Sequence, residues 1–220
     1  MYIKRCYIFK LGAILTFAGL LFGGCGGQQK ILEEQVSRQN ETIQDLQRQN
    51  AELQARLAEK DNKAAEEYKN LDKYKQMLEG QLKDTGATVK SRGTQLVISL
   101  PSSKLFDAGQ YTLKPQAKEP LSKIAKALTA NFPTAVIRVE GHTDNQPLKK
   151  LKDKFKSNWE LSSARAASVL HYFVEECRMD PKRVYLAGLG EHHPVDNNAT
   201  KQGRQKNRRV EIVVLTRESI

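Results

Sequence analysis

One long segment of this chain is restricted to a helix or an unfolded linker. From Ile31 to Asp84 the sequence is rich in Gln, Glu, Lys, Leu and Ala, contains no proline, and has a single glycine, Gly80. These residue types favour helix, and the apolar ones are too few to build a core of their own. The segment therefore predicts a long helix or a linker rather than a globular domain.

Apolar residues in this segment recur at alternating steps of three and four. Together with one asparagine they form a single stripe: Leu32, Val36, Ile43, Leu46, Asn50, Leu53, Leu57, Ala64, Leu71, Tyr74 and Leu78. This is the heptad pattern of a coiled coil, which we expect over residues 31–85, and Asn50 at a core position favours a two-stranded homodimer. As a helix the segment would reach about 80 Å. Polar residues such as Gln39 and Lys60 interrupt the stripe, so a single solvated helix or a flexible linker stays open.

The first 24 residues have the pattern of a secretion signal. A basic start is followed by an uncharged, apolar stretch from Leu11 to Phe22. This order is typical of a signal peptide. The uncharged run falls short of the roughly 20 residues that a membrane-spanning helix needs. We therefore expect residues 1–24 to be removed on export.

Gly23-Gly24-Cys25 resembles a bacterial lipobox, in which the cysteine becomes the new N-terminus and is acylated, for example with palmitate. The resemblance implies a lipid anchor on Cys25, with residues 25–30 as the anchored linker. Gly26 follows the cysteine, so the acidic signal for retention in the inner membrane is absent. The expected location is the periplasmic face of the outer membrane. An ordinary signal peptide or a retained apolar anchor is the alternative.

Charge and cysteine content limit the partners. With 36 Lys and Arg against 25 Asp and Glu, the net charge is +11, which predicts an anionic partner. The basic residues form no patch interleaved with aromatics, which argues against nucleic acid and leaves envelope polymers and lipids. Cys6, Cys25 and Cys177 lack the spacing of a disulfide framework or a zinc site.

The C-terminal part alternates strand and helix patterns. Strands are expected at 95–100, 135–140, 183–187 and 210–215, and a helix follows Pro115 as far as Asn131. A second helix begins at Ser157 or Asn158. Its predicted core stripe is Trp159, Ser162, Ala166, Val169, Leu170, Phe173, Val174 and Cys177. The pattern predicts one α+β domain, with helices covering one face of a small mixed sheet.

Two parts of this domain place polar side chains where they can meet. Gly141-His142-Thr143-Asp144 lies where a strand ends and a loop begins, a position that exposes side chains on a rigid support. Asn158 and Arg165 are seven residues apart on a helix, so they share one face within about 20°. An acid from the strand end and a guanidinium from the helix can therefore converge on one ligand.

Five separated motifs follow the order and spacing of a known family. They are Phe106-Asp107, Gly141-His142-Thr143-Asp144, Asn158-x-x-Leu161-Ser162-x-x-Arg165-Ala166, Gly188-x-Gly190-Glu191 with Pro194, and Gly203-Arg204-x-x-Asn207-Arg208-Arg209-Val210-Glu211. On these motifs residues 89–216 resemble the OmpA-like peptidoglycan-binding family. The sequence from Asn158 to Ser162 is most similar to the MotB-type branch of that family. The resemblance implies a βαβαββ-type fold.

The resemblance also implies a ligand, the zwitterionic end of diaminopimelate in the peptidoglycan stem peptide. Arg165 would grip its carboxylate and Asp144 would accept from its ammonium. Thr143, Asn158, Asp107 and Arg208 would line the pocket. Alternatively, Asp144 and Arg165 form only a structural salt bridge, the Asp107 carboxylate caps a turn, and Arg208 serves the surface.

Nothing in the sequence indicates catalysis, a cofactor or a metal. His142 and the pair His192-His193 have no third ligand at a metal spacing and no accompanying nucleophile. Gly188-x-Gly190 lacks the third glycine of a dinucleotide loop, and these glycines, with Gly141, are expected to serve tight turns.

We therefore expect a non-enzymatic outer-membrane lipoprotein that tethers the membrane to peptidoglycan noncovalently. One alternative is a flagellar stator subunit, which needs a full membrane helix with a proton-handling acid that Leu11–Phe22 lacks. Another is an adaptor whose coiled coil docks a secretion or motility assembly to the cell wall.

Overall fold

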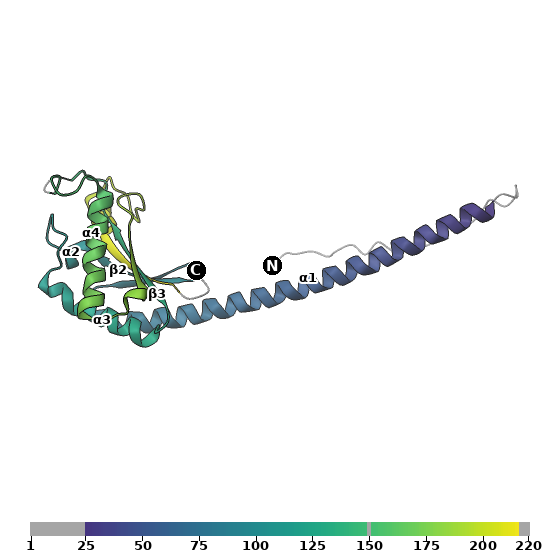
Figure 1. Ribbon diagram of the computed structural model, residues 1–220, viewed down its shortest axis with the longest axis horizontal. Helices are drawn as coiled ribbons and strands as arrows, with labels where there is room; N and C mark the ends of the chain where they lie inside the picture. The colour runs from purple at the N-terminus through teal and green to yellow at the C-terminus, as the bar shows by residue number, and fades with distance from the viewer. Residues whose placement is uncertain (1–24, 149–150, 216–220) are drawn as a thin grey trace. The chain divides into compact units, whose positions relative to one another are not determined.

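The computed structural model describes residues 25–148 and 151–215 (Figure 1). The chain divides into two compact units, Met1–Glu59 and Lys60–Ile220. We call the described part of the second unit the head domain. The predicted signal peptide, residues 1–24, lies outside the described residues. No helix in the described ranges has both the length and the apolar character needed to cross a bilayer.

Helix α1 (Cys25–Gln81) confirms the helix expected from the proline-free segment. Ion pairs one turn apart, such as Arg56–Glu52 at 2.6 Å, support it from the surface. Within the first unit its heptad stripe is exposed: Leu32 is 63% and Leu53 61% accessible. An open stripe is what a coiled-coil strand presents before a second helix packs on it, and the coiled coil itself stays a prediction.

The end of α1 has a different environment, which corrects the predicted extent of the coiled coil. Leu71, Leu78 and Leu82 are buried in the same apolar cluster as the sheet and helices of the head domain. The ring of Tyr74 packs on Phe132 with centroids 5.1 Å apart. From residue 71 onward the stripe therefore packs on the head domain of the same chain. The prediction of a coiled coil over residues 31–85 is wrong for this last part.

The head domain contains a five-stranded mixed sheet, which confirms the predicted α+β class. Its strands are β1 (Thr88–Arg92), β2 (Gln95–Pro101), β3 (Val136–His142), β4 (Val184–Gly188) and β5 (Arg209–Leu215). They lie in the order β1-β2-β5-β3-β4; β3 and β4 are parallel, and the other pairs are antiparallel. Strand β1 was not predicted; it is an edge strand in which Val89 alone is buried. The predicted βαβαββ order therefore lacks its first strand.

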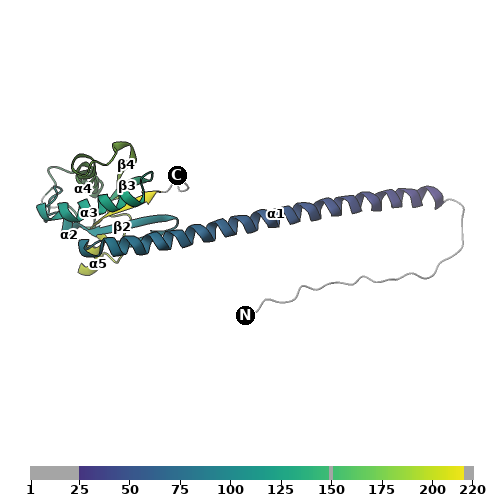
Figure 2. The ribbon, with the colours of Figure 1, turned by 90° about the horizontal axis from the view of Figure 1, so that it is seen from below.

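Helices α3 (Pro115–Asn131) and α4 (Asn158–His171) cover one face of the sheet, as expected (Figures 1 and 2). Helix α4 continues into a π-helical turn, Tyr172–Glu176. Two short helices were not predicted, α2 (Ser102–Leu105) and α5 (Lys201–Asn207), because neither has an apolar stripe. A 3₁₀ turn, Lys83–Thr85, follows α1, and another, Pro181–Arg183, precedes β4. Cys177 is half-buried rather than fully buried.

A pair of glycines brings α4 close to the sheet. Gly141 and Gly188 are neighbours on β3 and β4. A Cβ on Gly141 would lie 2.0 Å from the Ser162 carbonyl oxygen, and one on Gly188 would lie 1.9 Å from Ser163 Oγ. The expectation that these two serve turns is thus wrong, since they permit close packing; Gly190, at φ +55°, does serve a turn. The first turns of α4 are thereby held at the end of β3.

Candidate functional site

Asp144 lies two residues beyond the end of β3 and is 6% exposed. Its Oδ1 accepts from the Gln146 amide at 3.3 Å, which closes a short turn. Its Oδ2 accepts from Nη1 of Arg208, the residue that precedes β5. Because β3 and β5 are adjacent strands, the sheet itself brings this acid and this guanidinium together.

Arg165, two turns into α4, is 7% exposed. Its Nε donates to the Gln110 carbonyl at 3.1 Å, and its guanidinium lies over the Phe106 ring at 5.4 Å. Burial lowers the pKa of Arg165, the Arg208 charge lowers it further, and the Asp144 charge raises it. Among the described residues, Asp144 forms its ion pair with Arg208 and not with Arg165, contrary to the alternative of a structural Asp144–Arg165 salt bridge.

Asn158 and Thr143 tie the neighbouring loops together. Asn158 Nδ2 donates to Glu191 Oε2 at 2.6 Å, to the Gln146 carbonyl at 3.1 Å and to the Asp144 carbonyl at 3.4 Å. The Thr143 amide donates to the Gly190 carbonyl at 2.9 Å. Thr143 Oγ1 is buried and has no hydrogen-bond partner in the described part of the chain. A buried hydroxyl without a partner is costly, which makes Thr143 Oγ1 a candidate contact for a ligand.

Asp107 is the most exposed of the predicted site residues. Its side chain is 73% exposed and pairs with Lys114 at 3.2 Å. The loop that follows it supplies the Gln110 carbonyl that holds Arg165. The Asp107 carboxylate therefore forms an ion pair with Lys114, while the turn that follows is closed by the Gln110 amide on the Asp107 backbone carbonyl.

The site thus combines two guanidiniums, Arg165 and Arg208, with one carboxylate, Asp144. Their charges sum to +1, which suits an added carboxylate. The nearly buried position of Arg165 strengthens any charge-assisted hydrogen bond that it makes. A ligand that carries a carboxylate and an ammonium on one carbon could address Arg165 and Asp144 together.

A charged network that the sequence patterns did not indicate lies on the face of the sheet opposite to α4. Glu140 on β3 and Glu211 on β5 are direct cross-strand partners, an arrangement of like charges that is destabilising without compensation. Arg92 bridges both carboxylates at 3.1 Å. Arg138 holds Glu140 and Arg209 holds Glu211, each at 2.6 Å. The period-two spacing of these charges on the two strands was the available signal.

His142 completes this network. It is 1% exposed, and its Nε2 lies 3.7 Å from Glu140 Oε2 and 3.8 Å from Glu211 Oε2. These three side chains have the geometry of a metal donor set, so a third group near His142 does exist in space. Three arginines already engage the carboxylates, however, and their charge opposes a cation. We therefore assign the cluster to stability rather than to metal binding.

The network predicts a loss of stability in acid. Burial alone raises the pKa of Glu140, but its contacts with His142, Arg92 and Arg138 outweigh this and lower it from 4.5 to about 2. The stabilisation is complete above pH 4.5 and is lost as the pH falls toward 2, to a total of about 3 kcal/mol. Burial also lowers the pKa of His142, so protonation of the unfolded chain begins to reduce stability below about pH 6.5.

Urea unfolding between pH 7 and pH 3 measures this dependence. In Glu140→Gln the steep loss below pH 4.5 should flatten, while the loss that begins near pH 6.5 should remain. An unchanged acid limb in this variant would assign the pH dependence to other carboxylates.

Comparison with known proteins identifies the family of the domain. Residues 105–208 match the OmpA family. Motility protein B of Bacillus subtilis is 35% identical over 159 residues, which cover 70% of this chain and 59% of that protein. The outer-membrane lipoprotein YfiB of Pseudomonas aeruginosa is 36% identical over 133 residues, which cover 60% of this chain and 73% of YfiB.

The fold is shared with solved structures. The cell wall anchor of the T6SS from Pseudomonas aeruginosa matches with a TM-score of 0.57 and 30% identity, over 66% of this chain and 96% of the anchor. The chain spans 51% to 62% of the length of the first curated relatives that it matches.

Proposed function

The chain belongs to the OmpA family, and we propose that its head domain binds the stem peptide of peptidoglycan at the cluster of Arg165, Asp144 and Arg208. The observation that carries this proposal is the nearly buried Arg165, whose charge is not taken up by the neighbouring Asp144. The ligand is the zwitterionic end of diaminopimelate. Its carboxylate binds the guanidinium of Arg165, and its ammonium binds the carboxylate of Asp144.

The other predicted site residues support the two contacts made by Arg165 and Asp144. Arg208 pairs with Asp144, and it turns toward the ligand carboxylate when the ligand ammonium takes its place beside Asp144. Thr143 Oγ1 gains the hydrogen bond that it lacks, and Asn158 fixes the loop that carries Asp144. Asp107 contributes through its loop, which holds Arg165 by the Gln110 carbonyl.

Competition between two stem tripeptides tests the ligand. Purified chain is sedimented with isolated sacculi in the presence of the tripeptide that ends in diaminopimelate or of the same tripeptide that ends in lysine. The α-amino group of lysine is in the peptide bond, so only diaminopimelate offers an ammonium and a carboxylate on one carbon. We expect the diaminopimelate peptide to release the chain at a concentration at least about tenfold lower than the lysine peptide. Equal competition would show that the site does not recognise the carboxylate at the zwitterionic end.

For the whole chain, we propose an outer-membrane lipoprotein, anchored by acyl chains on Cys25, that tethers the membrane to the cell wall. The lipobox-like Gly23-Gly24-Cys25 and the similarity to the lipoprotein YfiB support this role. Mass spectrometry of the mature N-terminus tests the anchor. A diacylated or triacylated Cys25 is expected, and Cys25→Ser should yield a chain without lipid; an intact Met1 would contradict the anchor and favour the stator alternative.

An adaptor role is the second candidate, and the similarity to a T6SS cell wall anchor favours it. In that case the exposed stripe of α1 docks a further envelope protein, whereas a tether uses it to pair two copies of the chain. Cross-linking through residues between Leu32 and Leu57 separates the roles, because a tether recovers mainly itself.

A further inference from the structure

The loop of residues 107–112, between α2 and α3, is closed at its base. The two residues that flank it, Phe106 and Leu113, form an isolated antiparallel β-bridge. Near its tip Gly109 has φ +73°, a conformation that favours glycine. The loop is therefore a short, closed turn, and its backbone carbonyls lie against α4.

Two consecutive carbonyls of this loop accept hydrogen bonds from α4. The Gln110 carbonyl accepts from Arg165 Nε at 3.1 Å, and the Tyr111 carbonyl accepts from Ser168 Oγ at 2.6 Å. Arg165 and Ser168 are three residues apart, so they lie on one face of the helix. The two bonds therefore fasten one stretch of loop to one face of α4.

Ser168 has a second acceptor within reach. Its Oγ lies 3.1 Å from the Ala164 carbonyl, the usual acceptor for a serine inside a helix. A hydroxyl has one hydrogen to donate, and the shorter distance, to the Tyr111 carbonyl, is the better hydrogen bond. Ser168 thus gives up a bond within its own helix for a bond to the loop.

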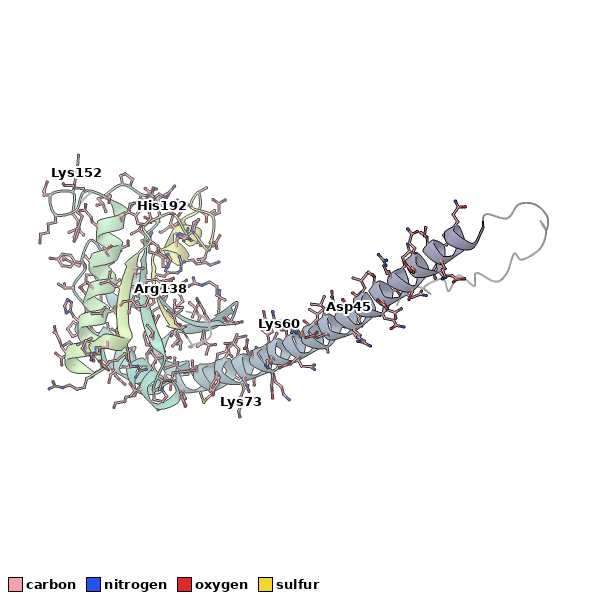
Figure 3. All side chains as sticks on the ribbon, turned by 45° about the vertical axis from the view of Figure 1, so that its right-hand side comes forward. Asp45, Lys60, Lys73, Arg138, Lys152 and His192 are labelled. Atoms are coloured by element: carbon pink, nitrogen blue, oxygen red, sulfur yellow. The ribbon has the colours of Figure 1, made fainter. Side chains whose placement is uncertain are left out.

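The ring of Tyr111 is held as well. It packs edge-on against Phe155 with centroids 5.3 Å apart, and Lys154 Nζ lies 5.7 Å from the ring centroid. Both residues belong to the segment that precedes α4, and Figure 3 shows the nearby Lys152 at the same end of the head domain as His192. The position of Tyr111 is therefore set through its ring, and its carbonyl connects it to α4.

These contacts decide which edge of the Arg165 guanidinium can meet a ligand. Nε is engaged by the Gln110 carbonyl, and one face of the group lies over the Phe106 ring at 5.4 Å. Among the described residues, this is the only hydrogen bond of the Arg165 side chain, so its two Nη groups are left for the two oxygens of a carboxylate. A guanidinium that is already oriented loses less freedom on binding.

We propose that Ser168 is a positioning residue for Arg165, and that it sets how strongly the site prefers diaminopimelate to a residue without the terminal carboxylate. The Ser168 hydroxyl fixes the Tyr111 carbonyl, and the adjoining Gln110 carbonyl then holds Arg165 Nε. Ser168 itself does not contact the ligand. This inference rests on the proposed function, because that function assigns the ligand carboxylate to Arg165.

Calorimetric titration of the full chain with the two stem tripeptides tests this role. The unmodified chain should bind the peptide that ends in diaminopimelate at least about tenfold more tightly than the peptide that ends in lysine. Ser168→Ala should weaken binding of the diaminopimelate peptide about fivefold, the size expected for one lost hydrogen bond, and should leave the lysine peptide within about twofold. Ser168→Thr, which keeps the hydroxyl, should retain the full preference.

Ser163→Ala is the matched control. Ser163 lies on the same helix, and its Oγ donates to the Trp159 carbonyl at 2.8 Å, so the substitution removes a bond within the helix but none to the loop. Both affinities should stay unchanged. In an Arg165→Lys background, Ser168→Ala should not change the preference further, because lysine has no Nε–H to donate to the Gln110 carbonyl. Circular dichroism checks that each variant is folded.

The failures are distinguishable. If the unmodified chain does not bind the diaminopimelate peptide, or binds both peptides equally, the proposed function is wrong. If Ser168→Ala keeps the full preference, or weakens both peptides alike, the positioning role alone is wrong, because Ser168 would then serve only the fold. A loss of preference that persists in folded Ser168→Thr would also overturn the positioning role.

Discussion

Replacing Arg165 with alanine should abolish retention of the chain on isolated sacculi. The guanidinium is 7% exposed, and in the proposed complex it forms charge-assisted hydrogen bonds to a carboxylate that has left water. Removing one partner of such a pair costs about 2 to 5 kcal/mol. We therefore expect the affinity to fall at least about thirtyfold. Cosedimentation over a range of sacculus concentrations measures the change.

The controls for this experiment separate binding from folding. Arg165→Lys keeps the charge but loses the planar fork, so it should recover only part of the affinity. Arg56→Ala removes an arginine from the surface of α1, where it pairs only one turn away with Glu52, and should bind normally. Wild-type retention of Arg165→Ala on sacculi would eliminate the proposed site.

The second large effect is expected at the end of α1. Leu78→Ala should lower the free energy of unfolding of the head domain by about 4 kcal/mol, because Leu78 is fully buried and the neighbouring elements can only partly fill the cavity left behind. Chemical denaturation followed by circular dichroism, with the transition of the sheet resolved, measures the change.

Leu53→Ala is the matched control, since Leu53 occupies the same heptad stripe but is 61% exposed. At low protein concentration it should leave the head domain unchanged. In a paired coiled coil it should weaken self-association, as analytical ultracentrifugation would show. Equal effects of both substitutions on the head domain would mean that the stripe has one partner along its whole length.

The sequence predicted most of the secondary structure because its signals were local. Gln95 to Leu100 alternates apolar and polar residues, and it forms β2. Pro115 and Asn131 bound a helix with an apolar stripe, and they bound α3. By contrast β1 carries a single buried residue, so its place at the sheet edge depends on pairing with β2 and leaves little pattern in its own sequence.

The candidate site likewise combines features that the sequence predicted with features that it did not. The sequence placed Asp144 at a strand end and Arg165 on a helix, and from spacing alone it suggested that they meet. The ion pair from Asp144 to Arg208 depends on β5 lying beside β3, which joins residues 64 positions apart. Trp159, which the helical stripe placed in the core, is instead 46% exposed and stacks on His192, a contact that helical periodicity does not report.

By itself, then, the sequence determined the α+β class, restricted residues 31–84 to a helix or a linker, and offered candidate residues for a ligand, because composition and periodicity act over neighbouring residues. Only the tertiary structure decided which side chains each of these residues contacts. The heptad stripe runs from Leu32 to Leu78, yet it is exposed in the first unit and is buried in the head-domain core from Leu71 onward. That change arises because apolar surface packs against whatever apolar surface is nearest, and nearness is a property of the fold.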